Sequence, residues 1–473
     1  EEIAVRLRER ATFEAYDKRA EAMVPKPVPV WLARTLANLS DLAPVRLLRG
    51  LVETPTLTAD ERIIEQSGYD PASRLFLRPT ATFPTVPAKP SQEKAKRAAD
   101  FLLDTVSDFP FAGDEHRVAW LALVLSLVAR EAVAGCVPIF LIDSHTRGSG
   151  KTLLADAANL IATGRPARRA TVPTDEEEGR KRVTAFLLAG SRFILLDNVQ
   201  EGRPIGGTWL DSLLTAETWE DRILGRSEMV CMPARLVIAA TGNNLQVGGD
   251  LSRRAIVVRL DPQQEKPEER ENFAHSPLAD WVLEKRPQLV VAALTILRAY
   301  LVAERPAQGL KAFGSFEKWC CLVRSAVHFA TGLDPAATRA ELATRDPRAA
   351  ALEALVENWG AVDPGGMGIT TKDLLARISE PGDVEEKEAI SQALEELIRA
   401  KPGIPLCARS VGNTLRGVKN RIIRGRRFVC EKDRKGFARW RLMDTSAECA
   451  DSCRTSPTPR EESVINELRD DIY

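Results

Sequence analysis

The sequence lacks the residue patterns of several protein classes. It contains eight cysteines and four histidines, but no CxxC pair and no place where the two residue types cluster. A structural zinc site and a disulfide framework are therefore not expected, and reduced cytosolic thiols are the default. The longest apolar stretches, 118–128 and 289–297, meet Arg130 and Arg298 well short of the ~20 residues that a membrane span requires. No signal peptide is recognisable, so the chain is not expected to act at a membrane.

An excess of either charge is also absent, because 66 Lys and Arg balance 66 Asp and Glu. This balance argues against a wholly polybasic protein, but it leaves room for charge that is segregated along the chain. An apolar fraction of 44% is ordinary for a globular chain, and 473 residues suggest about three domains of ~150 residues. The chain begins at Glu1 rather than Met, and it is expected to be a fragment of a longer protein.

Periodicity and composition predict six parts along the chain. We expect an N-terminal mixed region and linker (1–90), a helical region (91–136), a core of alternating strands and helices (137–262), a helical domain (263–355), a C-terminal domain of helices and a hairpin (356–442) and a disordered acidic tail (443–473). In the core, apolar segments at 138–143, 193–196, 236–240 and 255–258 predict strands. Helices separate these strands, which predicts a mainly parallel sheet and an α/β fold.

Local signals set some helix ends. A buried helix is predicted near 115–134, with Gly135 as its C-cap. Thr174 followed by Glu177 is typical of a capping box, which predicts a helix near 175–189.

The strongest chemical signal follows the first core strand. A glycine-rich turn leads into a helix, an arrangement in which backbone N–H groups and the helix N-terminus bind phosphate. Lys151 is expected to reach the β- and γ-phosphates, and Thr152 to bind Mg²⁺. His145 stands where the usual GxxxxGK[ST] pattern has glycine, and the alternative is a strand–helix turn that merely uses glycine. The candidate nucleotide-binding residues are Thr146, Arg147, Gly148, Ser149, Gly150, Lys151 and Thr152.

A second signal is the apolar strand that ends in Asp197, which fits the acid that holds Mg²⁺ in such enzymes. Asn198 follows it where many ATPases have a glutamate, and an amide is a poor base. Glu201 is a candidate substitute, although a solvated loop acid is at least as plausible.

Two further segments carry polar groups after strands. Asn243 and Asn244 follow a strand and are candidates to hold an attacking water, although an Asn pair after Gly is more often a turn. Arg253 and Arg254 are adjacent in a loop and are typical of a phosphate contact across a subunit interface, although a solvated loop is the alternative.

Basic residues concentrate near the C-terminus. Residues 401–441 contain 13 Lys and Arg against two acids, whereas the tail from 442 contains three Arg and eight acids. Ser410 is a candidate cap for a helix at 411–420, and segments 426–430 and 437–442 are expected to pair as a hairpin. One helix followed by a basic hairpin is a winged-helix pattern. A separate hairpin is predicted at 222–232, with Arg226 at its tip. The candidate DNA-binding residues are Arg226, Arg416, Lys419, Arg426, Arg427, Lys435, Arg439 and Arg441.

In this order, the motifs GSGKT, LLDN, TGNN and GDLSRR resemble the helicase portion of primase–helicase replication proteins of phages, plasmids and integrative elements. These are AAA+-like P-loop ATPases close to superfamily 3 helicases, and the resemblance runs from about Thr54 to Leu442. It implies an α/β P-loop (AAA+-like) core with flanking helical regions and a C-terminal winged-helix domain.

The resemblance also implies a homo-hexameric ring with ATP and Mg²⁺ at subunit interfaces, single-stranded and forked DNA as partners, and a bacterial host cytoplasm. Lys151 and Thr152 match the P-loop pair, Asp197 the Walker B acid, Asn243 the sensor with Asn244 as alternative, and Arg253 or Arg254 the trans-acting arginine. A primase module often precedes this portion, and none is recognisable here.

The expected function is an ATP-dependent DNA helicase or translocase. Two alternatives remain: a DNA-stimulated ATPase that loads or remodels without unwinding, and a DNA-binding initiator or regulator that binds nucleotide as a switch. Asn198 keeps the second alternative open.

Overall fold

The computed structural model describes residues 2–38, 46–223, 228–345, 347–380, 384–398, 406–434 and 436–445. Its centre is a five-stranded, all-parallel sheet with the strand order β14-β8-β13-β10-β9. The strands are β8 (Ile139–Ser144), β9 (Arg168–Ala170), β10 (Phe193–Val199), β13 (Val237–Asn243) and β14 (Ala255–Leu260). This confirms the predicted α/β core with a parallel sheet, and all four predicted strands are present.

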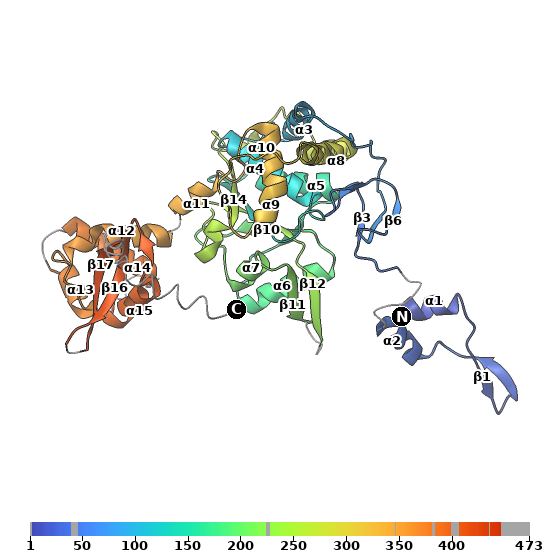
Figure 1. Cartoon of the computed structure of the whole chain (residues 1–473), viewed down its shortest axis with the longest axis horizontal. Helices are drawn as coiled ribbons and strands as arrows, with labels where there is room; N and C mark the ends of the chain where they lie inside the picture. Colours follow the sequence, from blue (N-terminus) through green and yellow to red (C-terminus); the bar gives the residue numbers. More distant parts are fainter. Residues whose placement is uncertain are drawn as a thin grey trace, which may run out of the picture.

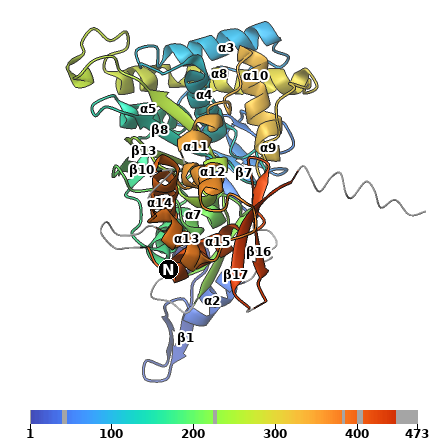
Figure 2. The same ribbon diagram turned by 90° about the vertical axis from the view of Figure 1, so that its left-hand side faces the viewer.

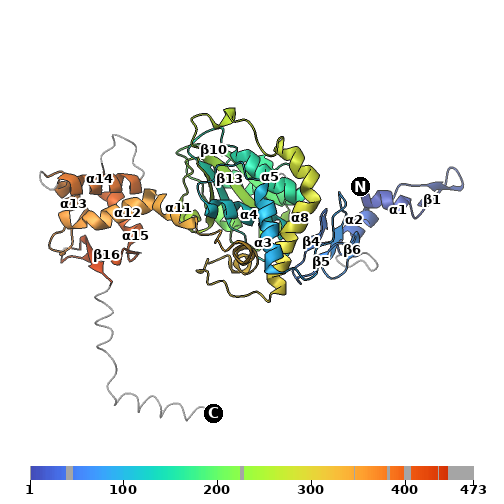
Figure 3. The same ribbon diagram turned by 90° about the horizontal axis from the view of Figure 1, so that it is seen from above.

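Strands β8 and β13 are buried on both sides, because other elements pack on both faces of the sheet. Figure 3 shows α3, α5 and α8 together on one side of β13. That layer comprises α3 (Gln92–Asp104), α4 (Asp114–Val128), α5 (Lys151–Thr163), α8 (Leu278–Val302), α9 (Glu317–Trp319), the π-helical turn Cys320–Arg324 and α10 (Ser325–Thr331). The other face is covered by α6 (Glu176–Leu188), α7 (Thr208–Leu213) and the hairpin β11 (Thr218–Arg222) and β12 (Met229–Pro233).

Helix α4 is buried along most of its length, as predicted, but it ends at Val128 and not near 134. The cause is Arg130, whose buried guanidinium donates to the carbonyl oxygens of Val133 and Gly135 at 2.8 and 3.0 Å. The side chain thus satisfies carbonyls in a turn, and Gly135 (φ 101°) belongs to that turn instead of capping the helix.

The predicted cap of α6 is also wrong by one residue. Asp175 is the N-cap, and its carboxylate accepts from the Glu178 backbone N–H at 2.8 Å. Glu177 pairs with Lys181 instead of closing a capping box. Asp is as good an N-cap as Thr, so the local pattern permitted either register.

The N-terminal region contains α1 (Glu2–Arg8), β1 (Glu14–Asp17), β2 (Ala22–Pro25), α2 (Val30–Asn38), β3 (Gly50–Val52), β4 (Thr56–Leu57), β5 (Ile63–Ile64), β6 (Gly68–Asp70) and β7 (Leu75–Leu77). Figure 1 shows the first four of these elements away from the sheet. The expected linker continues from this region but packs closely: Val86 is only 2% exposed, and Arg298 of α8 donates to its carbonyl oxygen at 3.3 Å.

The C-terminal unit has its own core, centred on Trp359, Leu415, Phe428 and Trp440. It comprises α12 (Pro347–Asn358), the turn Trp359–Ala361, α13 (Thr371–Ile378), α14 (Val384–Ile398), α15 (Ala408–Val418), β15 (Ile422–Ile423), β16 (Arg426–Lys432) and β17 (Ala438–Asp444). The boundary expected between residues 355 and 356 falls inside α12, whose Leu352, Leu355 and Val356 all belong to this core. α11 (Arg339–Arg345) precedes the unit in the chain.

The predicted helix and hairpin near the C-terminus are present, and Figure 2 shows the hairpin β16–β17 at the front. Helix α15 begins at Ala408 and not Val411, because Cys407 is its N-cap and accepts from the Ser410 backbone N–H at 3.5 Å. The predicted cap Ser410 lies within the first turn, and its hydroxyl donates back to the Cys407 carbonyl at 2.8 Å. Strand β17 runs to Asp444, and the expected disordered tail from 446 on lies outside the described residues.

Candidate functional site

The glycine-rich turn lies at the carboxyl end of the sheet, between β8 and α5. Gly148 (φ 71°) and Gly150 (φ 83°) both adopt left-handed backbone, which non-glycine residues rarely tolerate. A Cβ at Gly150 would lie 2.9 Å from Cε1 of Phe109, so close packing also requires glycine there. His145 is not among the positive-φ residues. The backbone at this position therefore does not demand the glycine that the sequence pattern leads one to expect.

Lys151 begins α5 and turns back onto the loop. Its Nζ donates to the Thr146 carbonyl and to Ser149 Oγ, both at 2.9 Å. Burial lowers the pKa of Lys151, and the nearby Asp143 carboxylate opposes this shift. The ammonium thus contacts two neutral oxygens in a partly buried position, where an anion would favour its charged form.

Thr152, in the first turn of α5, and Asp197, near the carboxyl end of β10, meet directly. Thr152 Oγ1 donates to Asp197 Oδ1 at 2.8 Å, and Thr241 Oγ1 donates to the same oxygen at 2.6 Å. Strand β13 lies between β8 and β10, which places Thr241 where it can hold the carboxylate. The sequence analysis missed Thr241, although it lies inside the TGNN motif.

Asn198, the residue after Asp197, is exposed to solvent beside the Thr152–Asp197 contact. Asn198 has φ 55° and an exposed side chain, and its backbone N–H donates to Thr241 Oγ1 at 3.0 Å. A bulge between Leu196 and Val199 accompanies this turn of the backbone. The residue directly after Asp197 is therefore an amide, which cannot act as a general base.

The two asparagines of the TGNN motif have different surroundings. Asn243 pairs with Ser144 in the strand register, directly at the start of the glycine-rich loop. Asn244 (φ 49°) turns away, and its Nδ2 donates to Glu201 Oε1 at 2.8 Å. The structure thus brings Asn243 to the loop and pairs Asn244 with the candidate base.

The adjacent arginines also separate. Arg254 is buried, with 11% of its side chain exposed, and donates to Asp211 Oδ1 at 3.2 Å and to Asp250 Oδ2 at 2.6 Å. The side chain of Arg253 is 66% exposed and pairs only locally with Asp250. Arg253 ends the short 3₁₀ turn Gly249–Arg253 and Arg254 caps it, and the two neighbouring side chains point in different directions.

Beside the loop lies a cavity of about 600 Å³. Its apolar wall comes from residues far apart in the sequence: Phe109, Pro110, Pro262, Pro267, Phe273 and Pro277. Gly148, Ser149 and Gly150 form its inner edge, so the cavity and the glycine-rich loop are continuous. Glu268, of the 3₁₀ turn Pro267–Glu269, packs on the loop, since its Oε2 lies 2.4 Å from where a Cβ at Gly148 would be.

A buried ion-pair chain supports the base of the loop. Asp143 Oδ2 accepts from Arg259 at 2.9 Å, Arg259 also pairs with Glu341 of α11 at 3.4 Å, and Glu341 pairs with His116 Nε2 at 3.0 Å. Burial raises the pKa of Asp143. No sequence motif pointed to this chain, because its members come from four distant segments.

The predicted DNA-binding residues of the C-terminal unit lie on α15 and the hairpin. Arg416 and Lys419 are exposed, Arg426 and Arg427 are half-buried, Arg439 donates to the Gly368 carbonyl at 2.9 Å, and Arg441 pairs with Glu431 at 2.5 Å. Arg226 and Lys435 lie outside the described residues. The hairpin expected around Arg226 is present as β11–β12, and its strands begin four residues earlier than predicted, at Thr218.

Within the described ranges, no group of three or more His, Cys, Asp or Glu residues is arranged to hold a metal ion. No helix in the same ranges combines the length and the apolar character needed to cross a bilayer.

No protein-family model matches the chain, and no curated protein matches it in sequence. Among solved structures, it is similar to an A-form apo structure of the C-terminal region of NrS-1, with 12% identity, a TM-score of 0.39, and coverage of 93% of this chain and 98% of that chain. A second apo structure of the same region has 13% identity, a TM-score of 0.38 and the same coverage. Similarity at this level does not identify a family for the chain.

Proposed function

We propose that the chain is an ATP-dependent DNA helicase or translocase that acts in the replication of a phage, plasmid or integrative element. The observation that carries the proposal is the hydrogen bond between Thr152 Oγ1 and Asp197 Oδ1 at 2.8 Å. It joins the first turn of a helix that follows a glycine-rich loop to the carboxyl end of another strand. A hydroxyl and a carboxylate at this place are the groups that hold Mg²⁺ in P-loop NTPases.

The residues present fit a nucleoside triphosphate. Gly148 and Gly150 give the loop the left-handed backbone that anion-binding turns use. The 13-residue helix α5 contributes its N-terminus, where the backbone N–H groups can bind phosphate. Lys151 is partly buried, and its Nζ donates hydrogen bonds to two neutral oxygens. A phosphate would replace these bonds with an ionic contact. The adjacent cavity, with its aromatic and proline walls, has the size and character for a nucleoside base.

When bound, Mg²⁺ neutralises developing charge on the β- and γ-phosphates. Thr152 and Asp197 would hold the ion, and Thr241 keeps the Asp197 carboxylate in place through the hydrogen bond at 2.6 Å. Lys151 leaves the Thr146 carbonyl for the phosphates. Asn243 lies beside the loop and orients water at the γ-phosphate.

Glu201 is the base that we assign to water activation. Asn198 has no basic group, whereas Glu201 is held at 2.8 Å by Asn244. Release of Glu201 from Asn244 would free the carboxylate to accept a proton. The same hydrogen bond keeps the second candidate open, a DNA-binding initiator that uses nucleotide as a switch and hydrolyses it negligibly.

Arg253 is the arginine that we assign to a neighbouring subunit's nucleotide. It is exposed, whereas Arg254 is committed to Asp211 and Asp250 within its own subunit. This assignment requires an oligomer whose subunits share sites, and a homo-hexamer is the assembly that we propose. The basic C-terminal unit and the hairpin β11–β12 supply the DNA contacts.

The direct test measures ATP hydrolysis with and without DNA, together with displacement of a strand from a forked duplex. Lys151→Ala should abolish both activities without lowering the melting temperature, because the side chain bonds only to its own loop. Equal ATPase rates for wild type and Lys151→Ala would refute the site assignment. Hydrolysis without strand displacement would leave the loading or remodelling ATPase, and ATP binding with negligible turnover would leave the initiator.

A further inference from the structure

The arginine that we assign to a neighbouring subunit's nucleotide, Arg253, takes its direction from the backbone. Its NH2 donates to Asp250 Oδ2 at 2.5 Å, and Arg254 donates to the same oxygen at 2.6 Å. Asp250 therefore stays paired with Arg254 when Arg253 leaves it, and the Arg253 side chain can extend. Where that side chain reaches depends on the peptide that carries it, at the end of the 3₁₀ turn.

Arg339, the first residue of α11, holds this peptide. Its NH2 donates to the Arg253 carbonyl oxygen at 3.2 Å, and its guanidinium carbon lies 3.4 Å from the centroid of the Phe313 ring. Phe313 is 3% exposed and belongs to the core on the α8 side of the sheet. A planar guanidinium can stack on a ring and donate from its edge at the same time. Arg339 therefore fixes the Arg253 peptide relative to the core.

The residues around the start of α11 also hold the strand that follows the turn. Thr338, directly before α11, accepts from the Val257 N–H at 3.1 Å through its Oγ1. Glu341, one turn into α11, pairs with Arg259 at 3.4 Å. Val257 and Arg259 both belong to β14, which lies at an edge of the sheet. The 3₁₀ turn and β14 are therefore both attached to α11.

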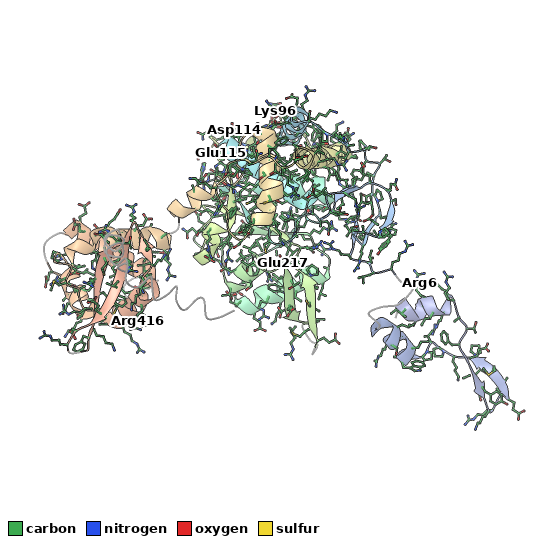
Figure 4. The ribbon with its side chains drawn as sticks, in the orientation of Figure 1. Arg6, Lys96, Asp114, Glu115, Glu217 and Arg416 are labelled. Atoms are coloured by element: carbon green, nitrogen blue, oxygen red, sulfur yellow. The ribbon has the colours of Figure 1, made fainter. Side chains whose placement is uncertain are left out.

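Helix α11 is also the element that leads into the C-terminal unit. It ends at Arg345, and α12, whose apolar residues belong to the core of that unit, begins at Pro347. Figure 1 shows α11 between the sheet and α12, and Figure 4 shows Arg416, a predicted DNA contact, at the lower edge of the same unit. A shift of the unit on DNA would reach the turn of Arg253 through α11.

We infer that Arg339 is a positioning residue for Arg253, and that α11 thereby links the C-terminal unit to hydrolysis at the neighbour's nucleotide. The inference rests on the proposed function, in which Arg253 acts in trans. Arg339 acts through Arg253 and not on the nucleotide, so its loss should lower kcat and leave the affinity for ATP unchanged. A displacement of about 1 Å in a catalytic group costs about 100-fold in rate, and this is the decrease in kcat that we expect for Arg339→Ala.

The first experiment uses the full chain and measures ATP hydrolysis with and without forked DNA, together with the Kd for ATP and for that DNA. Arg339→Ala should lose most of the kcat and most of the stimulation by DNA, while both Kd values stay at the wild-type level. Arg298→Ala is the matched control, because Arg298 also donates to backbone carbonyls, those of Val86 and Pro87 at 3.3 and 3.4 Å, but far from Arg253 in the chain. Its kcat should remain that of wild type.

The second experiment mixes variants, which separates a positioning role from a general loss of structure. Arg339→Ala mixed with Lys151→Ala should regain activity, because some sites then combine an intact Lys151 with a correctly held Arg253. Arg339→Ala mixed with Arg253→Ala should regain none, because every subunit then offers a defective arginine. The double variant should be no slower than Arg253→Ala alone, since both changes act through one group. If Arg339→Ala melts too low for assay, Arg339→Lys replaces it, because lysine keeps the charge but lacks the planar group, and the same pattern is expected.

An unreduced kcat or unreduced stimulation by DNA in Arg339→Ala, a raised Kd for ATP, or recovery on mixing with Arg253→Ala would each overturn the inference. Failure of the proposed function gives a different result. Wild type without ATPase activity, or a fully active Arg253→Ala, refutes the proposed trans-acting arginine and the inference with it. An inactive Arg253→Ala beside a fully active Arg339→Ala refutes the inference alone.

Discussion

The two adjacent arginines offer the sharpest test of the site, because the structure assigns them opposite roles. Arg254→Ala removes hydrogen bonds to the Asp211 carbonyl (3.1 Å), to Asp211 Oδ1 (3.2 Å) and to Asp250 Oδ2 (2.6 Å). Arg253→Ala removes only a local pair with Asp250, in which the arginine side chain is 66% exposed. We expect the first substitution to destabilise the fold and the second to remove catalysis.

The size of the first effect follows from burial. Breaking a buried ion pair costs about 3–5 kcal/mol, but the partners here are 32% and 40% exposed, which screens the charges they are left with. A loss of about 2–3 kcal/mol remains, and it lowers the melting temperature by about 4–12 °C for a unit of 150–250 residues. The exposed Arg253 should lower the melting temperature by at most about 4 °C, since surface ion pairs contribute about 0–1 kcal/mol.

The assays are thermal unfolding by calorimetry and DNA-stimulated ATP hydrolysis. An arginine that acts on a neighbour's nucleotide contributes about 10³- to 10⁵-fold to kcat, so Arg253→Ala should be inactive yet stable. Mixing it with inactive Lys151→Ala should restore part of the activity, because mixed oligomers contain sites with both groups intact. A stable, inactive Arg254→Ala together with an active Arg253→Ala would refute the assignment, and no restoration on mixing would refute action in trans.

Three further predictions concern separate parts of the molecule. Glu268→Gln removes a negative charge that is packed on the phosphate-binding loop and would repel the phosphates of ATP. Loss of about 1 kcal/mol of repulsion should lower the Kd for ATP, measured by calorimetry, about 5-fold; an unchanged or weaker affinity contradicts this placement. Glu131 is 8% exposed and pairs with Arg49, Arg192 and Arg235, so Glu131→Gln should cost about 3 kcal/mol and expose residues 46–53 to limited proteolysis, whereas wild-type resistance there would refute the role. Hydrogen bonds from Ser410 lower the pKa of Cys407, and the Glu220 carboxylate raises that of Cys231, so alkylation followed by mass spectrometry should reach half-maximum at lower pH for Cys407, and the reverse order would contradict the geometry.

The strands and the loop of the core were predictable because their signals are local. Apolar runs bounded by turn residues predicted four of the five strands, and the glycines predicted the backbone that Gly148 and Gly150 adopt. Strand β9 was missed, because its three residues, Arg168–Ala170, contain no apolar run. Helix ends were less predictable. Thr174 and Asp175 are both good caps, and only the structure shows that Asp175 is the one used.

The sequence by itself determined which residue types are available at the nucleotide site: a glycine-rich turn before Lys151 and Thr152, and an acid after an apolar strand. Local periodicity and turn chemistry are sufficient for that, because they act over a few residues. Only the tertiary structure decided which groups meet. The strand order places Thr241 against Asp197, the 3₁₀ turn buries Arg254 and exposes Arg253, and the Asn244–Glu201 pair holds a carboxylate that Asn198 cannot replace. These contacts join residues far apart in the chain, and their geometry depends on how the strands and helices pack as a whole.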